Sequence, residues 1–86
     1  MTEYEQLVKQ KIHGNLACGR IIETTKGEKF KCTGFMIGKL TPESEKGEYK
    51  ILQRLYPNGT LGEKEFYYTD EQWKTAMLED KIKFVN

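Results

Sequence analysis

The segment from Glu48 to Thr69 constrains the fold of this chain more than any other feature. Two runs of strand-forming residues, EYKILQRLY and LGEKEFYYT, flank the sequence Pro-Asn-Gly-Thr at positions 57–60. Proline fixes φ, and asparagine and glycine tolerate positive φ, so these residues favour a tight reversal of the chain. The segment therefore predicts a β-hairpin around which the domain is organised.

Apolar residues occupy both faces of this predicted hairpin. The alternating sets are Tyr49, Ile51 and Leu55 against Leu52 and Tyr56 in the first strand, and Phe66 and Tyr68 against Tyr67 in the second. A strand with apolar side chains on both faces is typical of a sheet that is covered on both sides. The pattern therefore predicts that the hairpin lies inside a sheet, with no free edge.

Two segments carry the signals of helices. Thr2-x-x-Glu5 and Thr69-x-x-Gln72 are capping boxes, and Gly14 is suited to end a helix over residues 2–13. Apolar residues recur at three- and four-residue spacing behind each box, which predicts one apolar stripe per helix. The stripes are Tyr4, Leu7, Val8 and Ile12 in the first helix, and Trp73, Ala76 and Met77 in the second.

Residues 16–38 predict another hairpin, with a turn at Lys26-Gly27 and a return strand that runs from Lys29 toward Ile37. One face of the return strand carries Phe30, Cys32 and Met36. The other face is charged at Lys29 and Lys31 and apolar at Phe35 and Ile37. A strand that changes environment midway is expected to bend, and Gly34 is the expected position. The alternation over residues 82–85 predicts a short last strand.

These elements predict one α+β domain over residues 1–86, and 37% hydrophobic residues suffice for a core without disulfide or metal. The sheet is expected to be strongly bent and antiparallel, or an SH3-like open barrel, with four to five strands. An N-terminal and a C-terminal helix are expected to flank and pack against it. The turn and bend positions between Arg20 and Tyr68 resemble those of SH3-like or Tudor-like barrels, a resemblance that implies the fold only.

The residues capable of site chemistry do not form a recognisable catalytic or metal motif. His13, Cys18 and Cys32 lack a fourth ligand and the paired spacing of zinc sites. Residues 14–19 have the glycine spacing of a phosphate loop without its Lys-Ser/Thr, and the carboxylates near Glu45 lie in a polar loop. The sequence predicts a non-enzymatic protein without metal or cofactor, with Cys32 in the core, both thiols reduced and His13 near a helix end.

The formal net charge of +1 gives no overall attraction to nucleic acid or membrane. Without a leader sequence or a long apolar run, the chain is expected to be cytoplasmic and not in a membrane. Residues 20–39 hold five cations against two carboxylates, and Lys29 and Lys31 share a strand face. Near Tyr56 or Tyr67 these lysines predict a nucleic-acid surface as one alternative. The other interpretation is lysines that protect the edge of a hairpin.

The leading functional hypothesis is a non-enzymatic protein-binding module. In size, Lys/Glu-rich composition and lack of catalytic residues, the chain resembles small phage or mobile-element proteins, many of which inhibit host defence or transcription proteins. The expected partner is therefore a host protein, or a second copy of this chain. A further alternative is an oligomer that sequesters a small nucleotide. The predicted binding residues are Arg20, Lys29, Lys31, Phe35, Tyr56 and Tyr67.

Overall fold

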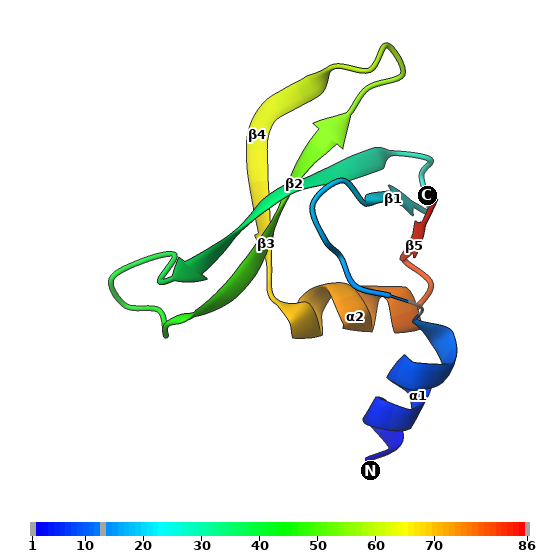
Figure 1. Cartoon of the computed structure of the whole chain (residues 1–86), viewed down its shortest axis with the longest axis vertical. Coiled ribbons are helices and arrows are strands. Elements are labelled where there is room, and N and C mark those ends of the chain that lie inside the picture. The colour runs from blue at the N-terminus through cyan, green and yellow to red at the C-terminus, as the bar shows by residue number, and fades with distance from the viewer. Residues whose placement is uncertain (1, 13, 86) are drawn as a thin grey trace.

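The computed structural model describes residues 2–12 and 14–85 and contains a five-stranded antiparallel sheet with two helices (Figure 1). Along the sheet the strands follow the order β4-β3-β2-β1-β5. The elements are α1 Glu3–Lys11, β1 Ile21–Thr24, β2 Lys29–Gly38, β3 Gly47–Leu55, β4 Leu61–Tyr68, α2 Asp70–Leu78 and β5 Ile82–Phe84.

Strands β1 to β4 follow one another as a meander, and α2 then returns the chain so that β5 pairs with β1. Because β4 and β5 lie at opposite ends of the strand order, the sheet is open. The predicted α+β class, with an antiparallel sheet flanked by an N-terminal and a C-terminal helix, is confirmed.

The organising hairpin is formed by β3 and β4, and Gly59 in its turn has a φ of 87°. The prediction that this hairpin has no free edge is correct for β3 and wrong for β4, which is an edge strand. Charged side chains explain how β4 tolerates this position, because the exposed residues Glu63, Lys64 and Glu65 disfavour edge-to-edge pairing.

The core lies between α2 and one face of the sheet, which we call the inner face. In the centre of that face, Leu52 of β3 lies opposite Cys32 of β2 and Phe66 of β4. Trp73 and Met77 of α2 are buried against it, while Ala76 is half-buried. The full set of buried residues is Ile12, Leu16, Ile22, Cys32, Leu52, Trp73 and Met77.

Both halves of the capping box predicted for α2 are present. The backbone N–H of Gln72 donates to Thr69 Oγ1 over 3.1 Å, and the backbone N–H of Thr69 donates to Gln72 Oε1 over 2.9 Å. These bonds satisfy donors that a helix start otherwise leaves unpaired. They also fix where the chain leaves β4 and enters α2.

Helix α1 differs from the prediction. It ends at Lys11, two residues earlier than predicted. Among the described elements, α1 contacts α2 but no strand. The expectation that both helices pack against the sheet is therefore wrong for α1. Of the predicted apolar stripe, Tyr4 and Leu7 are exposed, Val8 packs against the core, and Ile12, just after the end of α1, is buried. Lys11 Nζ holds α1 to the end of α2 through Asp80 Oδ1, at 3.0 Å.

Strand β2 bends where the sequence predicted. Its pairing with β3 shifts between Cys32 and Gly34, which is a β-bulge. The extra residue reverses the alternation: Cys32 lies on the inner face, and so does Phe35, three residues later. The prediction that Phe35 and Ile37 share a face with Lys29 is therefore wrong, because it placed a bend at Gly34 without an extra residue that shifts the alternation.

Candidate protein-binding surface

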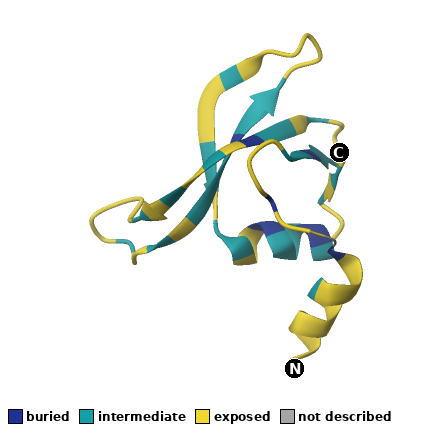
Figure 2. Ribbon diagram, in the orientation of Figure 1, coloured by how far each residue is buried: buried dark blue, intermediate teal, exposed yellow. Residues whose placement is uncertain are grey.

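The ends of β2 and β3 extend beyond the N-terminal end of α2 as an arm (Figure 1). We define the β2–β3 arm as residues 35–50, including the connecting loop 39–46. Much of the arm is exposed, in contrast to the central parts of the same strands (Figure 2). Because α2 does not extend over the arm, the inner face of the arm is open to solvent.

Two large apolar side chains of β2 lie on this open face. Phe35 is 63% exposed and Ile37 is 58% exposed, although both follow the inner-face pattern that buries Cys32. Leu40, in the loop of the arm, is also exposed. Most exposed apolar residues are scattered singly on a protein surface, so a group on one strand end indicates a contact surface.

The pairing of β2, β3 and β4 extends this surface to Tyr68, just before the start of α2. Phe35 lies opposite Lys50, and Lys50 lies opposite Tyr68, so the three side chains share the inner face. Lys50 Nζ is 5.9 Å from the centroid of the Phe35 ring. Tyr68 is 38% exposed. We call Phe35, Ile37 and Tyr68 the inner patch.

Tyr67 lies on the outer face, because it is opposite Ile51 and next to Tyr68. Its Oη donates to Glu65 Oε1 over 3.0 Å, and this hydrogen bond raises the pKa of Tyr67. The structure therefore does not bring Tyr67 and Phe35 into the single patch that the sequence predicted.

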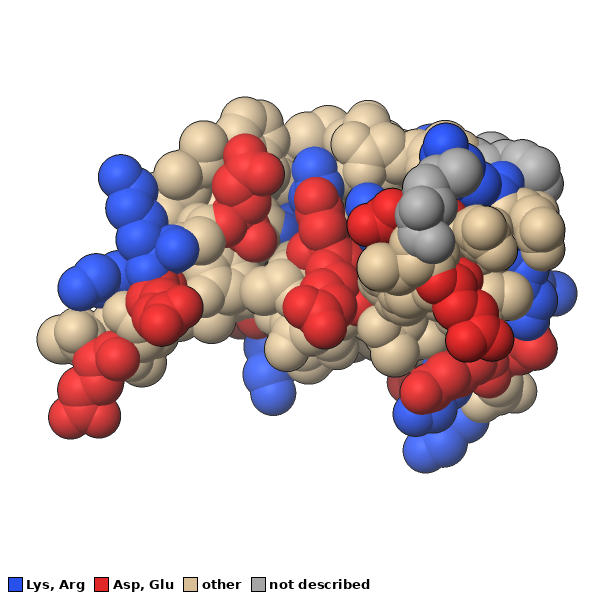
Figure 3. Space-filling view, turned by 90° about the horizontal axis from the view of Figure 1, so that it is seen from below, with Lys and Arg blue, Asp and Glu red and all other residues tan. Residues whose placement is uncertain are grey.

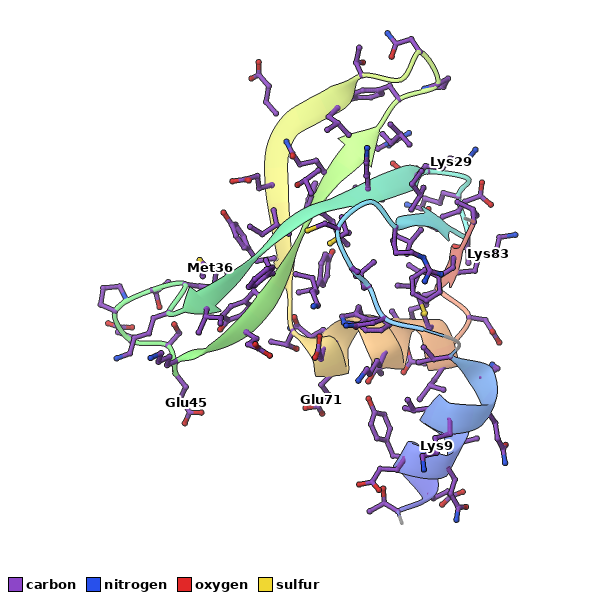
Figure 4. All side chains as sticks on the ribbon, viewed as in Figure 1. Lys9, Lys29, Met36, Glu45, Glu71 and Lys83 are labelled. Carbon is purple, nitrogen blue, oxygen red and sulfur yellow. The ribbon has the colours of Figure 1, made fainter. Side chains whose placement is uncertain are left out.

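Tyr56 and Lys29 do lie together, at the other end of the sheet. They line a pocket of about 390 Å³ beside the β3–β4 turn, and Arg54 lines it as well. The Arg54 guanidinium is 5.4 Å from the Tyr56 ring centroid and forms an ion pair with Glu28. Figure 4 shows Lys29 and Met36 at opposite ends of β2, so this pocket is well separated from the arm.

The two other predicted cations have different surroundings. Lys31 shares the outer face of β2 with Lys29, but β2 is the central strand, so the interpretation as edge-protecting lysines is wrong. The guanidinium of Arg20 lies over the ring of Phe84, which packs against the core. The Arg20 side chain thus contacts β5, while its backbone oxygen accepts from the N–H of Cys32, next to Lys31.

The structure confirms the burial predicted for Cys32. Cys32 is buried and Cys18 is exposed, and both are free thiols. Burial is the main cause that raises the pKa of Cys32, and the neighbouring Cys18 raises it further. The prediction for His13 lies outside the described residues. Over residues 2–12 and 14–85, no cluster of three or more His, Cys, Asp or Glu side chains is arranged to hold a metal ion.

No protein-family model matches this chain, and no curated protein and no solved structure matches it either. Among the helices described, neither is long and apolar enough to cross a membrane. The assignment of function therefore depends on the geometry of the surfaces above.

Sequence reasoning found Phe35 but missed Ile37, Leu40 and Tyr68 as surface residues. Each belongs to an apolar pattern that usually marks a core, and no pattern shows where α2 stops covering the sheet. The change from charged to apolar residues along β2 was the available signal, and it was interpreted only as a bend.

Proposed function

We propose that this protein is a non-enzymatic protein-binding module that uses the inner patch as its contact surface. The observation that carries the proposal is the exposure of Phe35 and Ile37 on a face that elsewhere forms the core. Aromatic and large aliphatic side chains on a rigid strand give a partner much apolar area at low entropic cost. Lys50 lies between Phe35 and Tyr68, and Glu48 lies opposite Ile37, so both supply polar groups for contact with a partner.

A stoichiometric inhibitor of a host protein, encoded by a phage or mobile element, remains the specific hypothesis for this activity. Its support is the small size and mixed Lys/Glu composition of the chain. A second copy of the chain is the alternative partner for the same patch, since a twofold dimer buries the same surface on both subunits.

The decisive experiment compares partner capture by the wild-type protein and by the double variant Phe35→Ser/Ile37→Thr. Host lysate proteins retained by each are quantified by mass spectrometry, and oligomeric state is measured by sedimentation. The proposal expects a partner, or a dimer, that the wild type retains and the double variant loses at an unchanged melting temperature.

Tyr56→Ser is the matched control, because Tyr56 is exposed but lies at the other end of the sheet. It should leave capture and oligomeric state unchanged. A partner that is lost with Tyr56→Ser and retained by the double variant would place the site at the β3–β4 turn. Equal retention by all variants would contradict the inner patch as a contact surface.

The pocket of Lys29, Arg54 and Tyr56 favours nucleic acid as a second candidate function. Arg54 is paired with Glu28 there, so Lys29 would supply the phosphate contact and the exposed Tyr56 ring the base stacking. A gel-shift titration tests this candidate, with affinity expected to fall steeply with salt and with Lys29→Glu/Lys31→Glu. The nucleotide-sequestering oligomer stays a prediction, to be tested by the effect of nucleotides on melting temperature.

A further inference from the structure

A pocket of about 120 Å³ lies between α2 and the inner face of the sheet. Its floor includes the buried side chains of Leu52 and Trp73. Tyr68, Gln72 and Ala76, which retain solvent exposure, are among its other lining residues. For comparison, an apolar cavity of about 150 Å³ admits benzene. This pocket therefore suits part of one apolar side chain, and Tyr68 makes it continuous with the inner patch.

Several polar atoms of the residues that line the pocket already have partners within the chain. Thr24 Oγ1 accepts from two backbone N–H groups of its turn, at 3.3 Å each. Gln72 Oε1 accepts from Thr69, and Trp73 Nε1 donates to Asp70 Oδ1 over 2.9 Å. A polar occupant would lose its hydration without gaining these groups as partners. The pocket therefore selects an apolar occupant.

A second hollow, of about 450 Å³, runs along α2 and shares Gln72 and Ala76 with the pocket. Its carboxylates are Glu71 and Glu79. Glu79 is paired with Lys81 at 2.8 Å, whereas Glu71 has no ion-pair partner among the residues described. Glu71 points away from the sheet in Figure 4, and on that side of the molecule acidic groups lie among apolar and basic ones in Figure 3.

We propose that these neighbouring hollows bind an extended, basic segment of a protein partner. One leucine- or phenylalanine-sized side chain of the segment enters the pocket below α2, and a neighbouring lysine or arginine pairs with Glu71. This inference rests on the proposed protein-binding function and adds an anchor site to it. Apolar anchors that fill a pocket, with charged contacts around them, are the usual source of affinity and specificity in protein interfaces.

Four capped pentapeptides test the two parts of the inference separately. The probe is acetyl-Gly-Lys-Phe-Lys-Gly-amide, and the others replace phenylalanine by alanine, both lysines by glutamate, or all three. Binding is followed by the NMR shifts of the Trp73 indole N–H and of the Gln72 and Ala76 amides. The probe should give saturable shifts, with affinity at least about fivefold weaker when either the anchor or the lysines are replaced.

Two protein variants complete the test. Ala76→Leu, which narrows the entrance to the pocket, should abolish the shifts caused by the probe. Glu71→Gln should weaken binding of the lysine peptide about threefold and leave binding of the glutamate peptide unchanged. Glu3→Gln, on α1, is the matched control and should change neither. Because the peptide series is measured on the wild-type protein, the test holds even where Ala76→Leu disturbs folding.

The outcomes separate this inference from the proposed function. If all four peptides bind equally, or if none shifts these signals at about 10 mM peptide, roughly tenfold above a Kd of 1 mM, the anchor site is wrong. The protein-binding function still stands in that case if Phe35→Ser/Ile37→Thr abolishes partner capture. If the lysine–phenylalanine peptide binds and the double variant retains its partner, the anchor site stands and the inner patch is wrong.

Discussion

The guanidinium of Arg20 lies 3.7 Å from the centroid of the Phe84 ring and thereby joins the segment before β1 to the last strand. Arg20 Nη1 also lies 3.5 Å from the backbone oxygen of Asn15. Strand β5 has only three residues and lies at an edge of the sheet. The cation–π contact therefore helps to hold a strand that backbone pairing with β1 alone would hold weakly.

Replacing Arg20 should consequently lower stability. We expect Arg20→Ala to reduce the free energy of unfolding by about 1 kcal/mol, through loss of the cation–π contact and of side-chain packing. Arg20→Lys should lose about half as much, since an ammonium group does not stack as a plane. Urea denaturation measures both changes. Lys26→Ala, in an exposed turn, is the control, and an equal effect of Arg20→Ala and Lys26→Ala would contradict the role of the cation–π contact.

The two helix caps provide a second prediction. Thr69 and Thr2 each accept a backbone N–H three residues on, at 3.1 and 3.2 Å. Loss of such a cap costs about 1 kcal/mol when the helix belongs to the cooperative core. Thr69→Ala should therefore destabilise the whole protein by about that amount. Thr2→Ala should leave global unfolding unchanged, because α1 has no buried residue.

Hydrogen exchange distinguishes these effects. Thr2→Ala should increase exchange only in α1, whereas Thr69→Ala should increase exchange throughout the slowest core amides. If both substitutions lower the urea midpoint equally, α1 is part of the cooperative unit and its limited packing has been underestimated.

Much of the fold could be predicted from local signals. The turn at residues 57–60, the caps at Thr2 and Thr69 and the bend at Gly34 each depend on the chemistry of a few neighbouring residues, and each is found in the structure. The apolar stripes of α2 and β3 likewise predicted the buried residues Trp73 and Leu52.

What failed depends on long-range placement. Whether Tyr4 and Leu7 are covered is decided by where α1 packs, and their spacing carries no information on this. β4 is an edge strand because β5 pairs with β1 rather than with β4. The face of Phe35 depends on a single extra residue in β2, and a pattern of period two cannot locate that insertion.

Burial of Cys32 makes stability depend on pH. Burial raises its pKa, so the folded state holds the proton at a pH where the unfolded thiol, with a pKa near 8.5, has lost it. The thiol's contribution to stability is complete below pH of about 8.5 and is lost as the pH rises through the raised pKa. The free energy of unfolding of the wild type should fall in this range by at most about 1.4 kcal/mol per pH unit from this group.

The Cys32→Ala variant isolates this effect. It should be less stable than the wild type at pH 7, and the difference should shrink between pH 8 and 10. Cys18→Ala is the control and should retain most of the pH dependence, because burial is the largest cause of the shift. A difference between Cys32→Ala and the wild type that stays constant over this range would show that the thiol does not titrate with folding.

The bulge in β2 gives the last prediction, which compares two phenylalanines on the same face of one strand. Phe30 precedes the bulge, packs against the core and meets Phe66 edge to face, with ring centroids 5.6 Å apart. Phe35 follows the bulge and lies on the open arm.

Phe30→Ala should lower the free energy of unfolding by about 2–3 kcal/mol, as expected for a partly buried aromatic residue. Phe35→Ala should lower it by less than about 0.5 kcal/mol while it weakens partner binding. Urea denaturation of both variants measures the difference, and a loss of stability at Phe35 equal to that at Phe30 would show that the arm is covered in the folded protein.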